Sequence, residues 1–440
     1  MAVTAPGRLQ PTTRLAPTLV LASLGFVSLG LPEGMLGVAW PSIRATFDLP
    51  LDALGLLIAT FAAGYFVSSA ISGRVIGRFG VGGVLAASCC LTGVCLLGYA
   101  VAPSWSGMVV LAAFLGLGAG TIDGGLNTYA AIAHGPRTLN WMHAAFGLGA
   151  AVGPLIMTLI LSSGLAWNAG YAVVAVAQLG LAVGYWLTRR RYTSGPDAVS
   201  EEQTPCRTTP DSSLADGTPY AGGPDAVSAE RPPHRAAGSG ARLVRLPLIW
   251  LSLGLFFVYV GMEAGAGQWS FSLFTLSREM PAALAGALVS AYWASLTIGR
   301  VLFGALVPRL GAQRLLRACM LACVLAAGLL WANIPVVSWL ALAVLGLAFA
   351  PIFPVLIAET PTRLGQAQAA DAIGWQVAAA VVGGATLPAL LGVMSTRWSL
   401  EVVGPTLVAA GLVQLGLYAA LTRKAASSET AQARLRATTK

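Results

Sequence analysis

The stretch Gly116-Leu-Gly-Ala-Gly-Thr-Ile-Asp-Gly-Gly-Leu-Asn-Thr128 decides the fold, and it lies inside an apolar run from about Met108 to Ala133. A run of this length crosses a bilayer as a helix. Asp123 stands near its middle, where an ionisable side chain is costly in hydrocarbon, so we expect it to face a polar interior. Asn127 follows four residues later and shares its face. Glycines at 116, 120 and 124 let a second helix come close. The alternative is a carboxyl that only packs against a neighbouring helix.

The composition is that of an integral membrane protein. Of 440 residues, 56% are hydrophobic and 10% charged, whereas soluble domains carry about 25% charged residues. The mean hydropathy is +0.74. The net charge of +9 falls in short loops and tails without interleaved aromatics, so we expect no nucleic-acid partner. Five of the six cysteines lie in apolar runs and are interpreted as small apolar filler.

Twelve apolar runs, each of roughly 20 residues or more, predict an all-α protein with twelve transmembrane helices. The first six cover about 16–40, 52–76, 82–102, 107–133, 138–162 and 167–188, and the others about 246–274, 282–307, 313–333, 336–358, 369–394 and 400–422. Residues 189–245 are rich in Pro, Gly and Ser and are expected to be a disordered linker between the bundles 16–188 and 246–422. Residues 1–15 and 423–440 are expected to be tails. Prolines, including Pro41, are expected to mark span boundaries.

The distribution of arginine and lysine predicts the orientation. One set of loops, together with both tails, carries most of these residues, and the opposite side has only Arg44, Arg278 and Arg397. By the positive-inside rule, both termini are cytoplasmic, which requires an even number of crossings. We expect a multi-pass protein of the plasma (inner) membrane.

The two bundles resemble copies of one another. Gly73-Arg-Val-Ile-Gly-Arg-Phe-Gly80 corresponds to Gly304-Ala-Leu-Val-Pro-Arg-Leu-Gly311, so Arg78 matches Arg309. Glu33 in the first span matches Glu263 in the seventh. The offset is nearly constant, at 230–234 residues. These matches predict two six-helix pseudo-repeats around a central cavity.

The polar residues inside the spans are the candidates for chemistry. Only Glu33, Asp123 and Glu263 are acids deep in apolar runs. A carboxyl withdrawn from water favours its neutral form, so these groups, Asp123 above all, can take up and release a proton. Arg300 lies toward the cytoplasmic end of its run, where we favour a structural or gating role over substrate contact. Amide, imidazole and indole side chains that can contact a polyhydroxylated solute are Asn127, Asn140, His143, Gln268, Trp269 and Gln376.

Several motifs resemble those of the major facilitator superfamily, and within it the fucose permease-like sugar/proton symporters. Ile122-Asp123-Gly-Gly-Leu-Asn127 is similar to the fourth-span motif of that family, whose acid is tied to proton coupling. Tyr259-Val-Gly-x-Glu263 and Ile298-Gly-Arg300 also match family patterns. The resemblance covers both bundles and implies a transporter that works by alternating access.

The chain departs from the family at four positions. Gly77 stands in the loop motif Gly73…Arg78-x-Gly80 where an acid is usual, so this loop lacks the acid of the family's usual charge relay. In the fifth span, His143 replaces a substrate-binding glutamine and Phe146 replaces an asparagine. Gly37 occupies the position of the first-span acid, and Glu33, one turn earlier, is the possible substitute. The implied site is therefore less sugar-like than that of the family.

These features predict a proton-coupled symporter of a small polar, sugar-like solute, working as a monomer in the lipid bilayer without a cofactor or metal. Gly73, Arg78, Gly80, Arg300, Arg309 and Gly311 are expected to be gating or structural residues. Two alternatives stay open: a proton-coupled exporter of a drug-like or secondary metabolite, and a receptor that keeps the fold without transporting. No phosphate-binding loop of an ATPase and no metal-ligand cluster occurs in the sequence, so we do not expect an enzyme.

Overall fold

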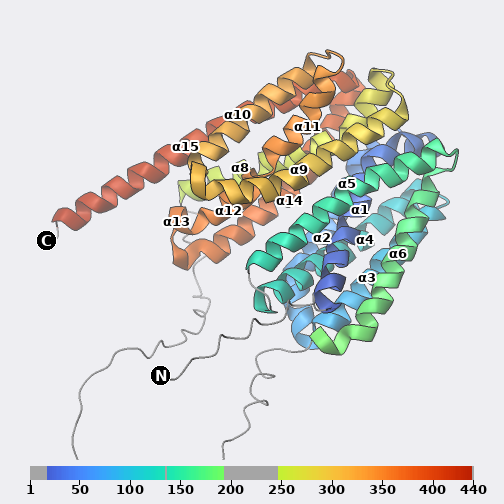
Figure 1. Ribbon diagram of the computed structural model, residues 1–440, viewed down its shortest axis with the longest axis horizontal. Helices are drawn as coiled ribbons and strands as arrows, with labels where there is room; N and C mark the ends of the chain where they lie inside the picture. Colours follow the sequence, from blue (N-terminus) through green and yellow to red (C-terminus); the bar gives the residue numbers. More distant parts are fainter. Residues whose placement is uncertain (1–16, 134–135, 193–245, 439–440) are drawn as a thin grey trace, which may run out of the picture.

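The computed structural model describes residues 17–133, 136–192 and 246–438, and every element within these ranges is helical. Figure 1 shows two bundles of helices lying side by side, the first half of the chain in blue to green and the second in yellow to red. Eleven helices within the described ranges are long and apolar enough to span a membrane, and α2 contributes the apolar stretch Ala53–Ser69 as the remaining span. The predicted fold class is confirmed.

The first bundle consists of six helices that follow the apolar runs closely. They are α1 (Pro17–Thr46), α2 (Ala53–Phe79), α3 (Val81–Ala100), α4 (Trp105–Ala133), α5 (Pro136–Ser162) and α6 (Trp167–Thr188). Proline opens α1 and α5, where its missing N–H costs nothing because the first turn has no partner for it. A short 3-10 turn, η1 (Arg189–Tyr192), extends α6.

The second bundle contains more breaks. It comprises α8 (Pro247–Ser272), the short π-helix η3 (Leu273–Ser277), α9 (Ala282–Leu310), α10 (Ala312–Trp331), α11 (Val337–Phe349), α12 (Ile352–Ala358), α13 (Thr360–Leu364), α14 (Gln366–Arg397), the 3-10 turn η4 (Leu400–Val402) and α15 (Val403–Thr438). The tenth span is interrupted at Ala350 and Pro351, between α11 and α12. Its counterpart in the first bundle, α4, is continuous.

Three boundaries differ from the sequence prediction. Pro41 does not end the first span, because α1 continues through it to Thr46. Residues 189–192, assigned to the linker, belong to η1, whereas 193–245 lie outside the described residues, as do 1–16. The expected tail from 423 continues α15 as helix to Thr438, and Figure 1 shows this helix leaving the bundle.

The loop glycines give structural support to the internal repeat. Gly80 joins α2 to α3 with φ 73° and ψ 152°, and Gly311 joins α9 to α10 with φ 78° and ψ 135°. Positive φ is strained for residues that carry a Cβ, so both turns require glycine. Two loops 231 residues apart therefore share one uncommon conformation.

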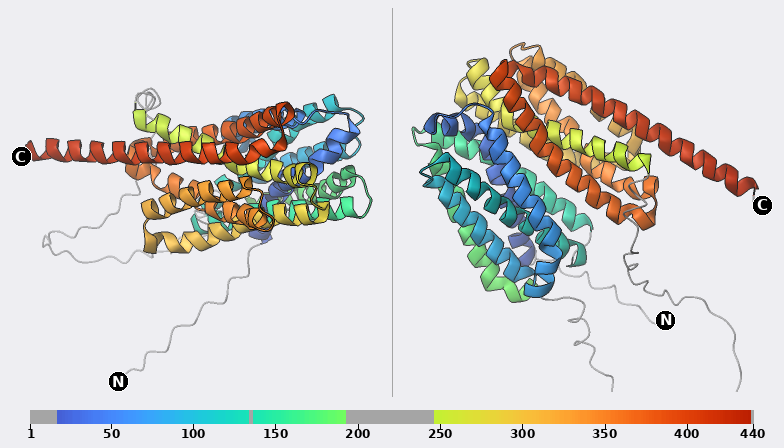
Figure 2. Two further views of the ribbon diagram at one scale, coloured as in Figure 1. Left: turned by 90° about the horizontal axis from the view of Figure 1, so that it is seen from above. Right: turned by 180° about the vertical axis from the view of Figure 1, so that it is seen from behind.

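The halves meet at the end opposite to the one where α1 begins. The backbone N–H of Asp52 donates to Thr396 Oγ1 at 3.2 Å, and a Cβ on Gly55 would lie 2.7 Å from that of Ala389. Thr158 packs directly on Gly286. In Figure 2 the ribbons of the two halves approach most closely at this end. These contacts hold the two halves together at this end of the molecule.

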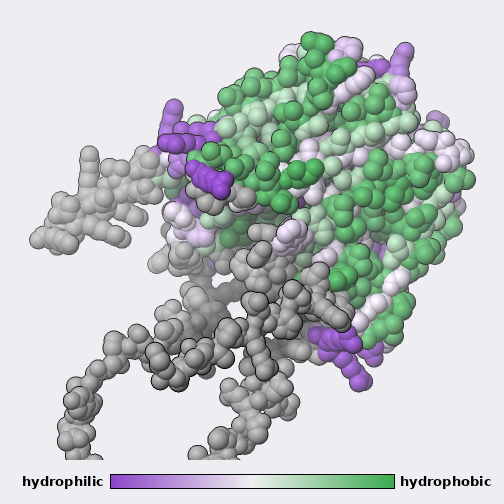
Figure 3. Space-filling view, in the orientation of Figure 1, coloured by the Kyte–Doolittle hydropathy of each residue, from purple (hydrophilic) through white to green (hydrophobic). Residues whose placement is uncertain are grey.

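The outer surface carries the apolar side chains that a bilayer requires. Exposed large hydrophobic residues are spread over both halves, for example Val176, Leu187, Leu325 and Leu340 at 69, 75, 60 and 64% exposure. Figure 3 shows this apolar surface covering the helices, with hydrophilic residues gathered at their ends. In water such a surface would aggregate, whereas in lipid it is the expected exterior.

Candidate functional site

The glycines of the deciding stretch bring α4 against α2, and this contact positions Asp123. A Cβ on Gly116 would overlap the carbonyl oxygen of Phe61, and one on Gly120 would overlap the Ser68 hydroxyl. Because the two backbones lie so close, the hydroxyl of Tyr65 on α2 reaches Asp123 Oδ2 and donates a hydrogen bond of 2.7 Å. The glycines therefore allow α2 and α4 to pack closely, and this packing places Tyr65 against Asp123.

Asn127 and His143 complete the polar group in the first half. Asn127, one turn after Asp123, hydrogen-bonds the same carboxyl, while its Oδ1 is buried without a partner among the described residues. His143, on α5, is near enough to Asp123 for the two groups to interact electrostatically. The imidazole packs edge-on against Phe26, with ring centroids 5.2 Å apart. Asn140 lies in α5, but its side chain is outside the described residues.

A second polar group is centred on Glu263 in α8. Arg300 Nη2 on α9 lies 3.3 Å from Glu263 Oε1, with the two side chains only 21 and 13% exposed. The hydroxyl of Tyr259, one turn earlier on α8, donates to Glu263 and also lies 3.2 Å from the Phe349 carbonyl oxygen. Tyr292 donates to the backbone oxygen of Glu263 at 2.8 Å. A shielded pair of opposite charges is thus held by three helices.

Glu33 on α1 lies between the two groups. The charges of Glu263 and Arg300 both act on Glu33, and Arg300 also acts on His143 of the first half. The Glu33 side chain is exposed, whereas its neighbours Gly34 and Met35 are buried. We call these ionisable groups, Glu33 on α1, Asp123 on α4, His143 on α5, Glu263 on α8 and Arg300 on α9, the charge cluster, and Glu33 opens it to water.

The helices of the two halves touch directly beside this cluster. Gln268 Nε2 donates to the backbone oxygen of Glu33 at 3.1 Å. A Cβ on Gly37 would lie 2.8 Å from the Gln268 carbonyl oxygen, and Gly147 on α5 packs on Thr297 of α9. Any movement of one half relative to the other must change these contacts and the distances between the charged groups next to them.

Gln376 and Trp269 use their polar side-chain atoms within the protein, whereas Gln268 leaves its buried Oε1 without a partner among the described residues. Gln376 is 1% exposed, and its Nε2 donates to Ser252 Oγ at 2.6 Å while Thr360 donates to its Oε1 at 3.0 Å. The indole of Trp269 donates to the Pro388 carbonyl oxygen at 2.9 Å. Gln268 is buried at the seam described above. Their roles in solute binding stay predictions.

The predicted gating residues lie at loop ends, away from the charge cluster. Arg78 and Arg309 are exposed, next to Gly80 and Gly311. The surroundings of Gly73 are not described by the structure. Arg300 differs from the others, because it lies within the cluster and pairs with Glu263. No gating role follows from these positions alone.

The tyrosines that hold the acids were not among the predicted site residues, although Tyr259 belongs to a motif that matches the family pattern. Tyr65, Tyr259 and Tyr292 each direct a hydroxyl to Asp123 or Glu263. A tyrosine inside a membrane span needs a hydrogen-bond partner, which is a usable signal. The sequence alone does not say which helix supplies that partner.

Both the sequence and the fold of this chain are similar to those of known proteins. The family model described as Major Facilitator Superfamily matches residues 22–388. "Bypass of stop codon protein 6" from Saccharomyces cerevisiae is 23% identical over 411 residues, 87% of this chain and 78% of that protein.

Solved structures share the fold at low sequence identity. A mutant of the nucleoside transporter NupG superposes with a TM-score of 0.70 at 14% identity, covering 92% of this chain and 99% of that one. A D-xylose-proton symporter gives 0.65 at 16% identity, covering 91 and 97%. A mutant of the Escherichia coli fucose:proton symporter FucP gives 0.59 at 15% identity, covering 93 and 99%. These likenesses establish the fold alone.

Proposed function

Because the chain belongs to the major facilitator superfamily and is a membrane transporter, we propose that it carries a small polar, sugar-like solute together with protons. The observation that carries this proposal is the position of Asp123. Its carboxyl lies within α4, is held by Tyr65 at 2.7 Å, and is linked electrostatically through His143 to Arg300 of the other half. A proton gained or lost there changes the charge balance across the seam between the halves.

The mechanism we propose is alternating access. With both termini in the cytoplasm of a plasma (inner) membrane protein, the contacts among Asp52, Thr396, Gly55 and Ala389 close the outer side. The described conformation then faces inward. Glu33, exposed next to Glu263 and Arg300, is the group that water reaches. Protonation of Asp123 removes a partly buried charge that must otherwise be balanced during the change of state.

Solute contacts are proposed for the residues around Asp123. Asn127 has a buried amide oxygen without a partner among the described residues, and a hydroxyl of the solute would satisfy it. His143 and Asn140 lie on the neighbouring α5. The D-xylose and fucose symporters with the same fold give the solute class its support. The transporter is proposed to work as a monomer.

Transport in proteoliposomes tests the proposal. Candidate solutes are screened for uptake driven by an imposed pH gradient, and hits are measured with Asp123→Asn. We expect this variant to lose proton-driven accumulation while solute exchange without a gradient partly persists. Asp48→Asn, the same change in the exposed turn after α1, is the matched control and should accumulate normally. Full accumulation by Asp123→Asn would contradict the proposed coupling site.

One observation favours a second candidate, a proton-coupled exporter of drug-like or secondary metabolites. His143 packs against Phe26 with ring centroids 5.2 Å apart, and Phe146 follows on the same helix. An aromatic site suits an amphipathic solute better than a sugar. The direction of flux separates the two candidates, since an antiporter expels solute against an inward proton gradient and a symporter accumulates it.

A further inference from the structure

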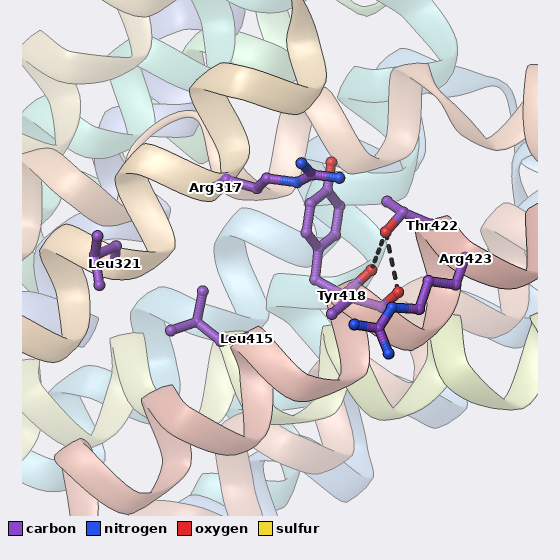
Figure 4. Close-up of a pocket in the computed structure, with 7 residues that line it drawn as sticks. Arg317, Leu321, Leu415, Tyr418, Thr422 and Arg423 are labelled. Atoms are coloured by element: carbon purple, nitrogen blue, oxygen red, sulfur yellow. Dashed lines mark hydrogen bonds between the residues drawn. The ribbon is translucent and has the colours of Figure 1, made fainter. Parts of the chain in front are cut away.

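A groove with a volume of about 570 Å³ lies between α10 and α15, on the outside of the second bundle (Figure 4). It is separate from the charge cluster, which lies where the halves meet. Its lining consists of Arg317, Leu321, Leu415, Tyr418, Ala419, Thr422 and Arg423. None of these seven residues is acidic, and two carry a permanent positive charge.

The groove lies at the border between the apolar surface and the polar end of the helices. Leu321 and Leu325 on α10 are 51 and 60% exposed, and Leu412 on α15 is 56% exposed. Arg317 is in the second turn of α10, and Arg423 stands near the end of the apolar part of α15. One wall of the groove therefore meets acyl chains, and its basic end reaches the depth of lipid headgroups.

Tyr418 is the polar residue on the α15 wall of the groove that Arg317 approaches. Figure 4 shows Arg317 extending from α10 toward the ring of Tyr418 on α15, with Arg423 one turn further along. The guanidinium of Arg363 lies 5.6 Å from the centroid of that ring, but it is paired with Glu359, so Arg317 and Arg423 are the cations considered for the groove. The Tyr418 side chain is 1% exposed, and its hydroxyl has no hydrogen-bond partner of normal geometry. Cations and a buried donor without an acceptor suit an anion with several oxygens.

We propose that this groove binds the headgroup of an anionic glycerophospholipid from the cytoplasmic leaflet. Both guanidinium groups contact the phosphate, and Leu321 and Leu415 contact the first methylenes of an acyl chain. The apolar lining continuous with the lipid-facing surface favours a lipid over a free phosphate ion. Basic sites between helices on the cytoplasmic side are suited to such headgroups. The lipid joins α10 to α15 and stabilises the second bundle.

Lipid titration of the purified full chain tests this site. Phosphatidylglycerol and phosphatidylcholine with identical acyl chains are added in detergent, and bound lipid is counted by native mass spectrometry alongside the melting temperature. We expect phosphatidylglycerol to bind more tightly and to raise the melting temperature more. Arg317→Gln with Arg423→Gln should weaken phosphatidylglycerol binding by roughly 30-fold, given about 1 kcal/mol for each basic residue.

The control is Arg74→Gln with Arg191→Gln, which removes the same charge from exposed positions in the other half and should keep the selectivity. Lysine at positions 317 and 423 should restore most of it, which separates lost charge from lost folding. Equal binding of the two lipids, or equal weakening by both glutamine pairs, would overturn the proposal. Protection by inorganic phosphate equal to that by phosphatidylglycerol would identify an anion site without a lipid and would overturn it too.

Discussion

Gly55→Val should open the seam that closes one end of the transporter. Even a Cβ at this position would lie 2.7 Å from the Cβ and 2.9 Å from the Cα of Ala389, whereas ordinary contact begins at 3.4 Å. The helices α2 and α14 must therefore separate by about 0.7 Å before the two further methyl groups of valine are placed. Overpacking of this kind costs about 1–3 kcal/mol. The strain exists only in the state closed at this end, so the ratio of closed to open molecules falls by roughly 5- to 150-fold.

Hydrogen exchange measured by mass spectrometry reports this shift. The backbone N–H of Asp52 donates the 3.2 Å hydrogen bond to the Thr396 hydroxyl, so we expect peptides that contain Asp52 to exchange faster in Gly55→Val. Gly107→Val is the control at the same end, because a Cβ there meets only the Ser104 hydroxyl at 3.4 Å. Unchanged exchange in a well-folded Gly55→Val protein would refute the reasoning that this seam is tightly packed.

Three further predictions follow from single contacts. Tyr65→Phe removes the 2.7 Å hydrogen bond to Asp123, so proton-driven uptake in proteoliposomes should fall more than exchange; equal loss of both would point to a folding defect. Glu401→Gln deprives Arg278, which is 7% exposed, of its ion pair at 2.7 Å; because Glu401 is partly exposed, we expect a loss of about 1–2 kcal/mol, seen as a lower melting temperature. Gly311→Ala forces a Cβ into a turn with φ 78° and should cost about 1 kcal/mol by the same assay, whereas an unchanged melting temperature would argue against that turn geometry.

Apolar runs predicted the helices well because a bilayer leaves few choices. The sixth span predicted from hydropathy, 167–188, has the same bounds as α6. Pro41 failed as a boundary because membrane helices tolerate proline where neighbouring groups compensate for the lost hydrogen bond. Composition predicted a tail from residue 423, and this was wrong because α15 continues as helix beyond its apolar part to Thr438; residues 193–245 and 1–16 lie outside the described residues.

The candidate site was predictable only in part. An ionisable side chain in an apolar run has a high free energy in hydrocarbon and is therefore expected to have a function. This is why Asp123, Glu33 and Glu263 were predicted as site residues. The partner of each acid depends on which helices pack together, and this is not written in local sequence. Arg300 illustrates the limit: its position in the run favoured a structural or gating role, and only the packing of α9 on α8 places it 3.3 Å from Glu263.

The interruption of the tenth span makes the two halves mechanically unequal. A continuous rod such as α4 must tilt as a whole, whereas a helix broken at Ala350 and Pro351 can bend in its middle. The Tyr259 hydroxyl contacts both the acid of the ion pair and the carbonyl oxygen of Phe349 at that joint. A change of charge at Glu263 therefore acts through Tyr259 on the joint between α11 and α12. We expect the C-terminal half of the transporter to bend more than the N-terminal half.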